Sequence, residues 1–253
     1  MRPAFAVAAA ALLLAGALLV TAPATLLDAR LAAFSDGHLR LANAGGTLWN
    51  GSGEMVLLPS GAREPLRWQL DAWPLLHGEV RVAIGTDGEG SPSGSVVYAR
   101  DHFDLRGLHL ALPVESILPF FTAAKLAIGG TLVVQVDHLA WQSHALDGQL
   151  TLQWRDASVP GPRADTRVAL GDVHIDLNGH GADLAGPVHN TGGDVEMVGQ
   201  LTLTAAGASS LEASLRPRDA DRARVDLVAA ALSTLGSADG QGGYRLRWSG
   251  AWR

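Results

Sequence analysis

Apolar and polar residues alternate along most of the chain from Leu39 onward. A glycine followed by such alternation recurs at Gly78–Ile84, Gly107–Leu112, Gly130–Val136, Gly148–Trp154, Gly171–Leu177, Gly199–Leu203 and Gly243–Trp248. A period of two is typical of a strand with one buried face, and glycine is typical of the turn that opens such a strand. The pattern therefore predicts a mainly β protein with an antiparallel sheet that is packed on one face only.

The apolar face of this sheet has three possible partners. A second sheet could cover it, the same sheet could curl on itself, or the face could line a groove for a ligand. Alternation alone does not distinguish these arrangements. Pairs of glycine-led strands before and after about residue 125 further indicate two similar halves.

Helix is predicted in few places. Thr25–Phe34 is expected to form a short amphipathic helix, and Pro113–Phe120 one or two turns. In Asp221–Leu235, one helical face would carry Val225, Val228, Ala229, Leu232 and Leu235, and we expect it to plug one end of the sheet. Gly236 would then end the helix in the left-handed conformation.

The first 24 residues form the strongest apolar segment of the chain. Ala4–Val20 is uninterrupted apolar sequence, about long enough to cross the ~30 Å hydrocarbon core of a membrane. We expect residues 4–24 to be a transmembrane signal-anchor, with residues 1–3 cytoplasmic and residues 25–253 periplasmic. The alternative is a cleaved signal peptide, because Ala22-Pro23-Ala24 has small residues at the spacing of a cleavage site.

Composition and motifs exclude several functional classes. The formal net charge of −6 argues against nucleic-acid binding, and the absence of cysteine excludes thiol catalysis and cysteine-ligated metals. The nucleophile elbow, the phosphate-binding loop and the His-Glu-x-x-His zinc motif are absent from the sequence. His174 and Asp176 alternate on one strand face but lack a convergent third metal ligand. We therefore predict no enzymatic activity, no cofactor and no metal site.

Tryptophan is the main aromatic residue, with 7 of the 14 aromatic side chains. The dipeptide pattern Leu-x-Trp recurs at Leu66, Leu152 and Leu246. Most tryptophans are expected to fill the core at strand ends, the alternative being an exposed aromatic rim that contacts a partner or lipid. Arg245 and Arg247 alternate with apolar residues and are interpreted as solvated charges of an edge strand.

Residues 46–51 read Gly-Thr-Leu-Trp-x-Gly, and this segment follows the apolar N-terminus. It resembles the signature of the type II secretion system protein N family. Leu66–Gly78, Gly148–Trp154 and Gly243–Gly250 also resemble that family, so the likeness covers nearly the whole chain. The residues that carry it, interpreted as structural, are Gly46, Thr47, Leu48, Trp49, Gly51, Trp68, Trp73, Gly78, Gly148, Trp154, Gly243 and Trp248.

The resemblance implies an accessory, non-catalytic component of the apparatus that exports folded proteins across the outer membrane. Its implied location is the bacterial inner membrane, crossed once, with the bulk of the chain in the periplasm. The expected partners are inner-membrane platform proteins, with the secretin as a further candidate. The family is also similar to AsmA-like envelope proteins, which implies a curved sheet and motivates an alternative function as a periplasmic module that binds or transfers phospholipid.

Overall fold

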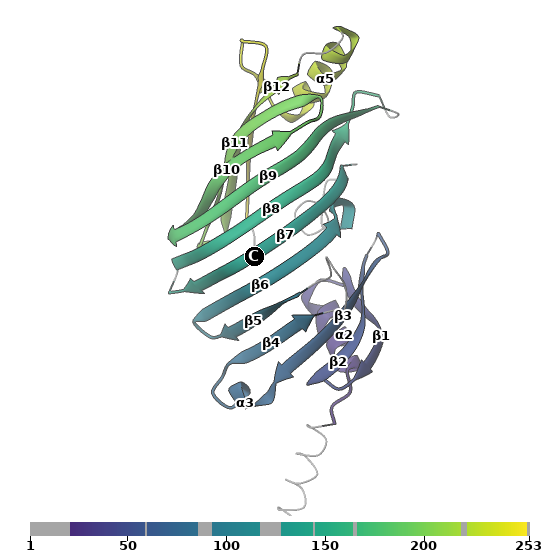
Figure 1. The fold of residues 1–253 in the computed structure, drawn as a ribbon, viewed down its shortest axis with the longest axis vertical. Helices are drawn as coiled ribbons and strands as arrows, with labels where there is room; N and C mark the ends of the chain where they lie inside the picture. Colours follow the sequence, from purple (N-terminus) through teal and green to yellow (C-terminus); the bar gives the residue numbers. More distant parts are fainter. Residues whose placement is uncertain are drawn as a thin grey trace, which may run out of the picture.

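A computed structural model describes residues 21–58, 60–85, 93–116, 128–143, 145–163, 166–218 and 222–251. Within these residues, one 14-stranded sheet has every adjacent pair of strands antiparallel (Figure 1). The strands are β1 (Leu39–Gly46), β2 (Asn50–Leu57), β3 (Ala62–Asp71), β4 (Val80–Gly85), β5 (Ser93–Ala99), β6 (His102–Pro113), β7 (Gly129–Gln142), β8 (Ala145–Pro160), β9 (Arg167–Gly181), β10 (Asp183–Thr191), β11 (Val195–Thr204), β12 (Ala208–Pro217), β13 (Ser237–Ala238) and β14 (Tyr244–Ala251). The helices are α2 (Thr25–Phe34), α3 (Ala72–Leu75) and α5 (Arg222–Leu235). The prediction of a mainly β, antiparallel protein is confirmed.

Strand order follows the chain from β1 to β12, and the sheet ends in the order β12-β14-β13. The architecture is therefore a long series of hairpins. Since β6 pairs with β7, the sheet continues without a break across residue 125. The division into two similar halves stays a prediction.

Several glycines that were predicted to lie in turns lie inside strands instead. Gly78 and Gly243 lie just before β4 and β14, but Gly107, Gly130, Gly148, Gly171 and Gly199 lie inside long strands. The turn assignment was wrong for these five. A Cβ atom at Gly148 would lie 2.1 Å from the carbonyl oxygen of His138 on β7, so a close approach between strands requires glycine there. Gly171 has φ +75° at a β8–β9 register shift, where a bulge requires it.

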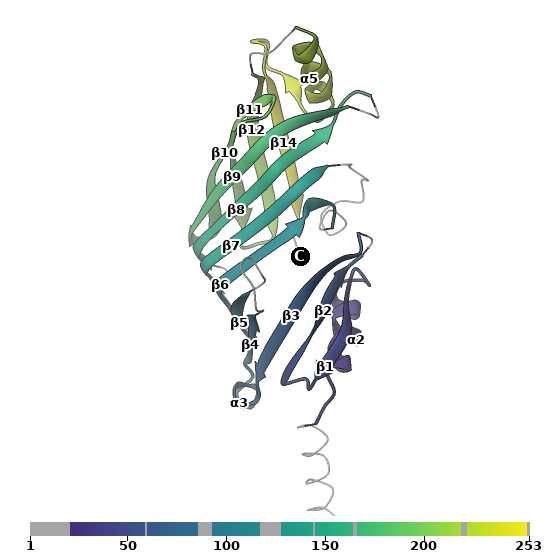
Figure 2. The ribbon, with the colours of Figure 1, turned by 45° about the vertical axis from the view of Figure 1, so that its right-hand side comes forward.

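The sheet curls, so that β12 and β14 are seen behind β8 and β9 (Figure 2). Side chains from distant strands consequently pack together: Leu139 and Trp141 of β7 join Leu201 and Leu203 of β11 around the buried Leu177. Of the three predicted ways to cover the apolar face, curling of the same sheet is found in this region. The predicted curvature is thus present.

A helix covers each end of the apolar face. Leu27 and Leu31 of α2 pack near Leu41 and Trp68, at the end of the sheet that carries β1 (Figure 1). The helix begins and ends where predicted, although Leu26 is 49% exposed, so its amphipathic character is weak.

At the other end of the sheet, α5 buries Val228, Ala231 and Leu232 against a core formed by β8 to β12. The predicted plug is confirmed, with Ala231 rather than the half-buried Ala229 in the core. The left-handed conformation at Gly236 was wrong, because Gly236 has no positive φ. A Cβ atom there would lie 2.5 Å from the carbonyl oxygen of Arg245, so close approach to β14 accounts for the glycine.

Two further predictions concern helices. Val114–Ser116 is helical, as predicted, but Pro113 is the last residue of β6, and residues 117–120 lie outside the described residues. The described part of the chain holds no helix that is both long enough and apolar enough to cross a membrane. Residues 4–20 of the predicted anchor also lie outside the described residues, which begin at Thr21.

Candidate functional site

The Gly-Thr-Leu-Trp-x-Gly segment forms the tight connection between β1 and β2. The Thr47 backbone N–H donates to the Asn50 carbonyl (2.9 Å), and the Asn50 N–H donates to Thr47 Oγ1 (3.1 Å). Gly46 has φ +86°, and a Cβ atom there would lie 2.6 Å from the Asn50 oxygen. Glycine and threonine at these positions therefore close the turn.

Trp68 of β3 supports this turn from the inner face. Its side chain is 6% exposed, and its Nε1 lies 3.3 Å from the Thr47 carbonyl oxygen and 3.2 Å from that of Leu48, to both of which it donates. The indole ring lies against Gly51, where a Cβ atom would be 2.3 Å from Trp68 Cζ2. The second glycine of the segment thus makes room for the tryptophan.

The other Leu-x-Trp tryptophans pack in a similar way. Trp154 Nε1 donates to the Gly129 carbonyl (3.0 Å), and a Cβ atom at Gly130 would lie 2.7 Å from that nitrogen. Trp248 lies over Gly250, whose Cβ atom would be 2.7 Å from Trp248 Cζ2. The recurring combination of tryptophan and glycine therefore reflects an indole ring packed on bare backbone.

The same turn holds the chain that leads into α2. The Leu48 N–H donates to the Ala22 carbonyl (2.8 Å), and the Ala24 N–H donates to the Gly46 carbonyl (3.3 Å). Ala22 is 8% exposed and Ala24 is 2% exposed. In the segment between residue 20 and α2, Ala22 and Ala24 are thus buried and hydrogen-bonded to the turn, whereas Thr21 and Pro23 are exposed.

Side chains of α2 also bond the outer edge of β1. Asp28 accepts from Arg40 Nε (2.9 Å) and Nη2 (2.7 Å) and from the Leu41 N–H (2.8 Å). The Arg40 guanidinium, and after it the Leu41 N–H, lowers the pKa of Asp28 to about 2. Ser35 Oγ accepts from the Leu39 N–H (2.9 Å). Two outward backbone donors of β1 are therefore satisfied by α2 and the residue that follows it.

The middle of the inner face is apolar and incompletely covered. From β4 to β7 the apolar residues meet across strands, as in the pairs Val82–Val96 and Tyr98–Phe103. These side chains are half-buried, and Tyr98 is 55% exposed. This stretch lies between the regions covered by α2 and α5.

A cavity of about 440 Å³ opens on this stretch. Tyr98, Phe103, Leu139, Trp141 and Leu146 line it from β5 to β8. Ala205–Gly207, in the β11–β12 turn, completes the lining. A concave and almost wholly apolar surface of this kind is suited to a hydrophobic ligand.

Comparison with known families accounts for the motif. The family described as "Type II secretion system (T2SS), protein N" matches residues 37–247. The chain belongs to this family. Type II secretion system protein N of Aeromonas hydrophila is 28% identical over 246 residues, which are 93% of each chain. The protein of the same name from Klebsiella pneumoniae is 27% identical over 244 residues, covering 93% of this chain and 90% of the relative. No solved structure matches.

The predicted protein N motif residues do not form one site. Gly46, Thr47, Leu48, Gly51 and Trp68 meet at the β1–β2 turn, as described above. The remaining predicted residues lie along the sheet: Trp49 in the same turn, Trp73 on α3, Gly78 before β4, Gly148 and Trp154 in β8, Gly243 before β14 and Trp248 in β14.

Trp73 differs from the other motif tryptophans. Its side chain is 74% exposed on α3, a helix that the sequence did not predict, and its ring centroid lies 6.2 Å from that of His77. It therefore fits the alternative of an exposed aromatic residue rather than a core filler.

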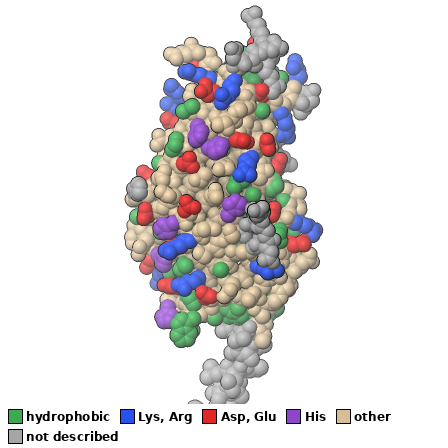
Figure 3. Space-filling view, in the orientation of Figure 1, with side chains coloured by type: hydrophobic (Ala, Val, Ile, Leu, Met, Phe, Trp, Pro, Cys, Tyr) green, Lys and Arg blue, Asp and Glu red, His purple; other side chains and the backbone are tan. Residues whose placement is uncertain are grey.

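The outer face of the sheet is polar. Figure 3 shows acidic, basic and histidine side chains scattered over it, between small hydrophobic patches. His174 stacks on His189 with ring centroids 5.4 Å apart, and Asp176 accepts a hydrogen bond from Thr151 Oγ1 (3.0 Å). No three histidine, cysteine, aspartate or glutamate side chains of the described residues gather to hold a metal ion.

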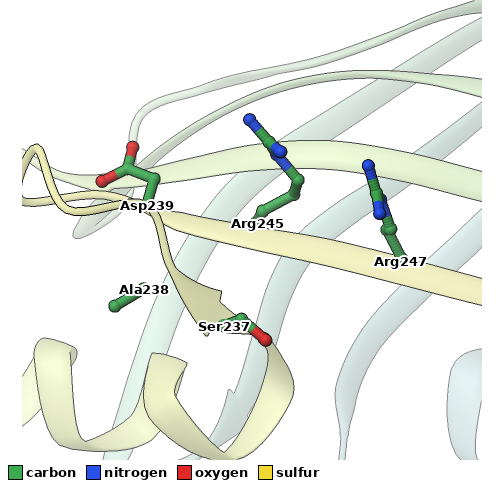
Figure 4. Close-up of a pocket in the computed structure, with 6 residues that line it drawn as sticks. Ser237, Ala238, Asp239, Arg245 and Arg247 are labelled. Carbon is green, nitrogen blue, oxygen red and sulfur yellow. The ribbon is translucent and has the colours of Figure 1, made fainter.

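A polar hollow of about 420 Å³ lies beside β13 and β14 (Figure 4). It is lined by Gly236–Asp239, Arg245 and Arg247. The backbone N–H groups of Gln241 and Gly243 bond Asp239 and lower its pKa. Arg247 Nε lies 3.4 Å from Glu212 Oε1, and both side chains are about two-thirds exposed (66% and 68%).

Sequence reasoning missed the bonds between α2 and β1. Asp28 and Arg40 are 12 residues apart, in a helix and a strand, so no local spacing indicates that they meet. The sequence does contain a signal for two cavity residues. Tyr98 and Phe103 lie on either side of a short turn in paired strands, and alternation places both on the same face.

Proposed function

We propose that this chain is a non-catalytic interaction subunit of a type II secretion system, held at the inner membrane by residues 4–24 and presenting its sheet in the periplasm. Membership of the protein N family over residues 37–247 supports the assignment. The observation that carries the anchoring role is the β1–β2 turn. Its motif residues Gly46 and Leu48 hydrogen-bond Ala24 and Ala22, at the periplasmic end of the proposed anchor.

The buried segment also supports an anchor that is retained. Cleavage after Ala24 would remove both the Ala22 carbonyl to which Leu48 donates and the Ala24 N–H that donates to the Gly46 carbonyl. We expect the mature protein to keep residues 1–24. Mass spectrometry of the N-terminal peptide from isolated membranes tests this, and a mature terminus at Thr25 would contradict it.

The mechanism is positioning. The turn, the Trp68 indole and the Asp28–Arg40 pair join the membrane-proximal segment to the first strands, so the orientation of the sheet follows that of the segment. The sheet then serves as a docking surface for inner-membrane platform proteins, with the secretin as a second candidate partner.

Deletion of the gene in its own bacterium tests the proposal. Secreted enzymes should accumulate in the periplasm of the deletion strain and return to the medium when the full chain is expressed. Trp68→Leu should restore secretion poorly because the turn loses both hydrogen bonds of the indole, whereas Trp73→Leu, at an exposed site on α3, is the matched control for the core tryptophan. Unchanged secretion in the deletion strain under several growth conditions would refute the secretion role.

A second candidate function is the binding of phospholipid on the inner face. The apolar cavity of about 440 Å³ and the half-buried face of β4 to β7 favour it. The volume lies within the ~300–1,000 Å³ that is usual for small-molecule pockets. The cavity is open to solvent, so a headgroup would stay in water while an acyl chain contacts Phe103 and Trp141.

Lipid extraction from the purified full chain, followed by mass spectrometry, tests this alternative. Phospholipid should copurify with the wild-type protein and with Gln142→Asp, which places a charge at an exposed residue of β7. It should be lost from Phe103→Asp, which places the same charge in the cavity lining. A lipid-free wild-type protein, or lipid retained by Phe103→Asp, would reject it.

A further inference from the structure

The two edges of the sheet differ in how their backbone groups are satisfied. At the β1 edge, Leu41 donates outward to Asp28 of α2, and Leu39 donates to Ser35, the residue after α2. At the other edge, β13 is only two residues long and pairs with Tyr244 and Arg245 of β14. β14 continues to Ala251, so most of its outer edge extends past β13.

The direction of the free backbone groups follows from the pairing. The Arg245 carbonyl points toward the β13 side, since a Cβ atom at Gly236 would lie 2.5 Å from it. Backbone direction alternates along a strand, so Arg247 and Ser249 direct their N–H and C=O groups to the same edge. No described residue pairs with that edge beyond Arg245.

The side chains along this edge define what could pair with it. Arg245 and Arg247 project from the same side of β14, next to the hollow of about 420 Å³ that lies where β13 ends (Figure 4). On the inner side, Trp248 is 45% exposed, whereas Tyr244 and Leu246 of the same strand are half-buried. The edge therefore offers cations on one face and an exposed aromatic ring on the other.

Features that usually protect an edge are scarce in β14. It is eight residues long, contains no proline and pairs with β12 without a register shift. Short length, proline and bulges are common means of preventing strand addition. Arg245 and Arg247 are the protective feature that β14 does have. Their positive charge disfavours basic partners but not acidic ones.

We propose that the β14 edge binds an extended segment of a partner protein as an additional strand, with acidic side chains over Arg245 and Arg247 and apolar side chains beside Trp248. The inference rests on the proposed function, for which it supplies the chemistry of the partner. Backbone hydrogen bonds provide the attraction in such strand addition, and alternate side chains provide the selectivity. Glu212 shares Arg247 at a distance of 3.4 Å while highly exposed, so an incoming carboxylate can join or replace it.

Charge argues against a second copy of this chain at the same place. Antiparallel pairing of two β14 edges would bring the arginines of both copies to one face of the joint sheet. Like charges directly opposite each other are destabilising. An acidic segment instead gains charge-assisted hydrogen bonds from the guanidinium groups.

Two synthetic octapeptides test the proposal with the purified full chain in detergent micelles. One alternates glutamate and valine, the other lysine and valine, and each carries a fluorophore for anisotropy. The glutamate peptide should bind at least about tenfold more tightly, a free-energy difference that one or two ion pairs can supply. Arg245→Glu combined with Arg247→Glu should reverse the preference.

Ser249→Pro and Ser249→Ala form the matched pair of variants. Proline is tolerated where the N–H faces away from the sheet, so Ser249→Pro should keep the melting temperature while losing peptide binding. Ser249→Ala keeps the N–H and should bind as the wild type does. Unchanged binding by Ser249→Pro, or equal affinity for the two peptides, would overturn the proposal.

Two more measurements separate this inference from the proposed function. The deletion strain complemented with Ser249→Pro should secrete less enzyme than the strain complemented with Ser249→Ala. Equal secretion by the two strains, with peptide binding abolished, would show that secretion does not use the β14 edge. That result would overturn this inference and leave the proposed secretion role intact. Analytical ultracentrifugation should show the same oligomeric state for the wild type and for Ser249→Pro. A dimer that this variant dissolves would assign the edge to a second copy and overturn the acidic partner.

Discussion

Replacement of Gly51 by alanine tests whether the β1–β2 turn depends on a glycine beneath Trp68. The new Cβ atom would lie 2.3 Å from Trp68 Cζ2, 2.6 Å from the Gly45 carbonyl oxygen and 2.8 Å from Trp68 Cε2. Van der Waals contact between such atoms requires more than 3 Å, so the indole must move. Movement weakens its hydrogen bonds to the Thr47 and Leu48 carbonyls.

The expected loss of stability follows from these contacts. Overpacking of a well-packed site costs about 1–3 kcal/mol. For a domain of this size, that corresponds to a melting temperature lower by roughly 2–12 °C. Gly45→Ala is the matched control in the same hairpin, because a Cβ atom there has no neighbour within 4 Å and its φ is not positive.

Thermal unfolding of the full chain in detergent, followed by circular dichroism, measures both variants. A double-mutant cycle with Trp68→Leu separates the two clashes. The smaller side chain should relieve part of the penalty of Gly51→Ala, leaving the part due to the Gly45 oxygen. If Gly51→Ala melts at the same temperature as Gly45→Ala, the packing account of the motif is incorrect.

Two further perturbations address the helices at the ends of the sheet. Because the pKa of Asp28 is lowered to about 2, its contribution to stability is present above the ordinary carboxyl pKa of ~3.9 and is lost as pH falls toward 2. Urea titrations at several pH values should show that Asp28→Asn reduces this pH dependence of the unfolding free energy. An equal reduction by Asp183→Asn, at an exposed residue, would contradict the assignment to Asp28. Leu232→Ala should cost about 2–5 kcal/mol because this side chain of α5 is 0% exposed in the core between the helix and the sheet. Differential scanning calorimetry should show a lower melting temperature for Leu232→Ala than for Ala230→Ser, at an exposed residue of the same helix. Equal melting temperatures would refute the role of α5 as a plug.

The sequence predicted the strand class and the helices α2 and α5, but not the short α3. The burial of Val228 and Leu232 follows directly from apolar spacing, and α2 has the predicted bounds. Glycine was harder to interpret, since the same pattern fits a turn such as Gly78 and a position inside a strand such as Gly148. The difference depends on the neighbouring strand, which local sequence does not contain.

The candidate site was predictable only in part. The motif itself indicated a structural role for Gly46 and Gly51, but not that Trp68 would donate to the turn or that the turn would hold Ala22. The openness of the inner face depends on how far the sheet curls. That curvature is a sum of small twists over many strand pairs, and no single residue reveals it.

The sequential order of the strands has a consequence for the kinetics of folding. Each strand from β2 to β12 pairs with the strand that precedes it in the chain, so most steps close a short loop; the longest connection, between β6 and β7, spans residues 114–128. Topologies with such local pairing fold faster than those that need distant strands to meet. We expect the sheet to assemble one hairpin at a time from the end that α2 closes, with an unsatisfied edge that moves toward β14. Binding of an extended partner segment at β14 would then repeat the step by which the sheet was built.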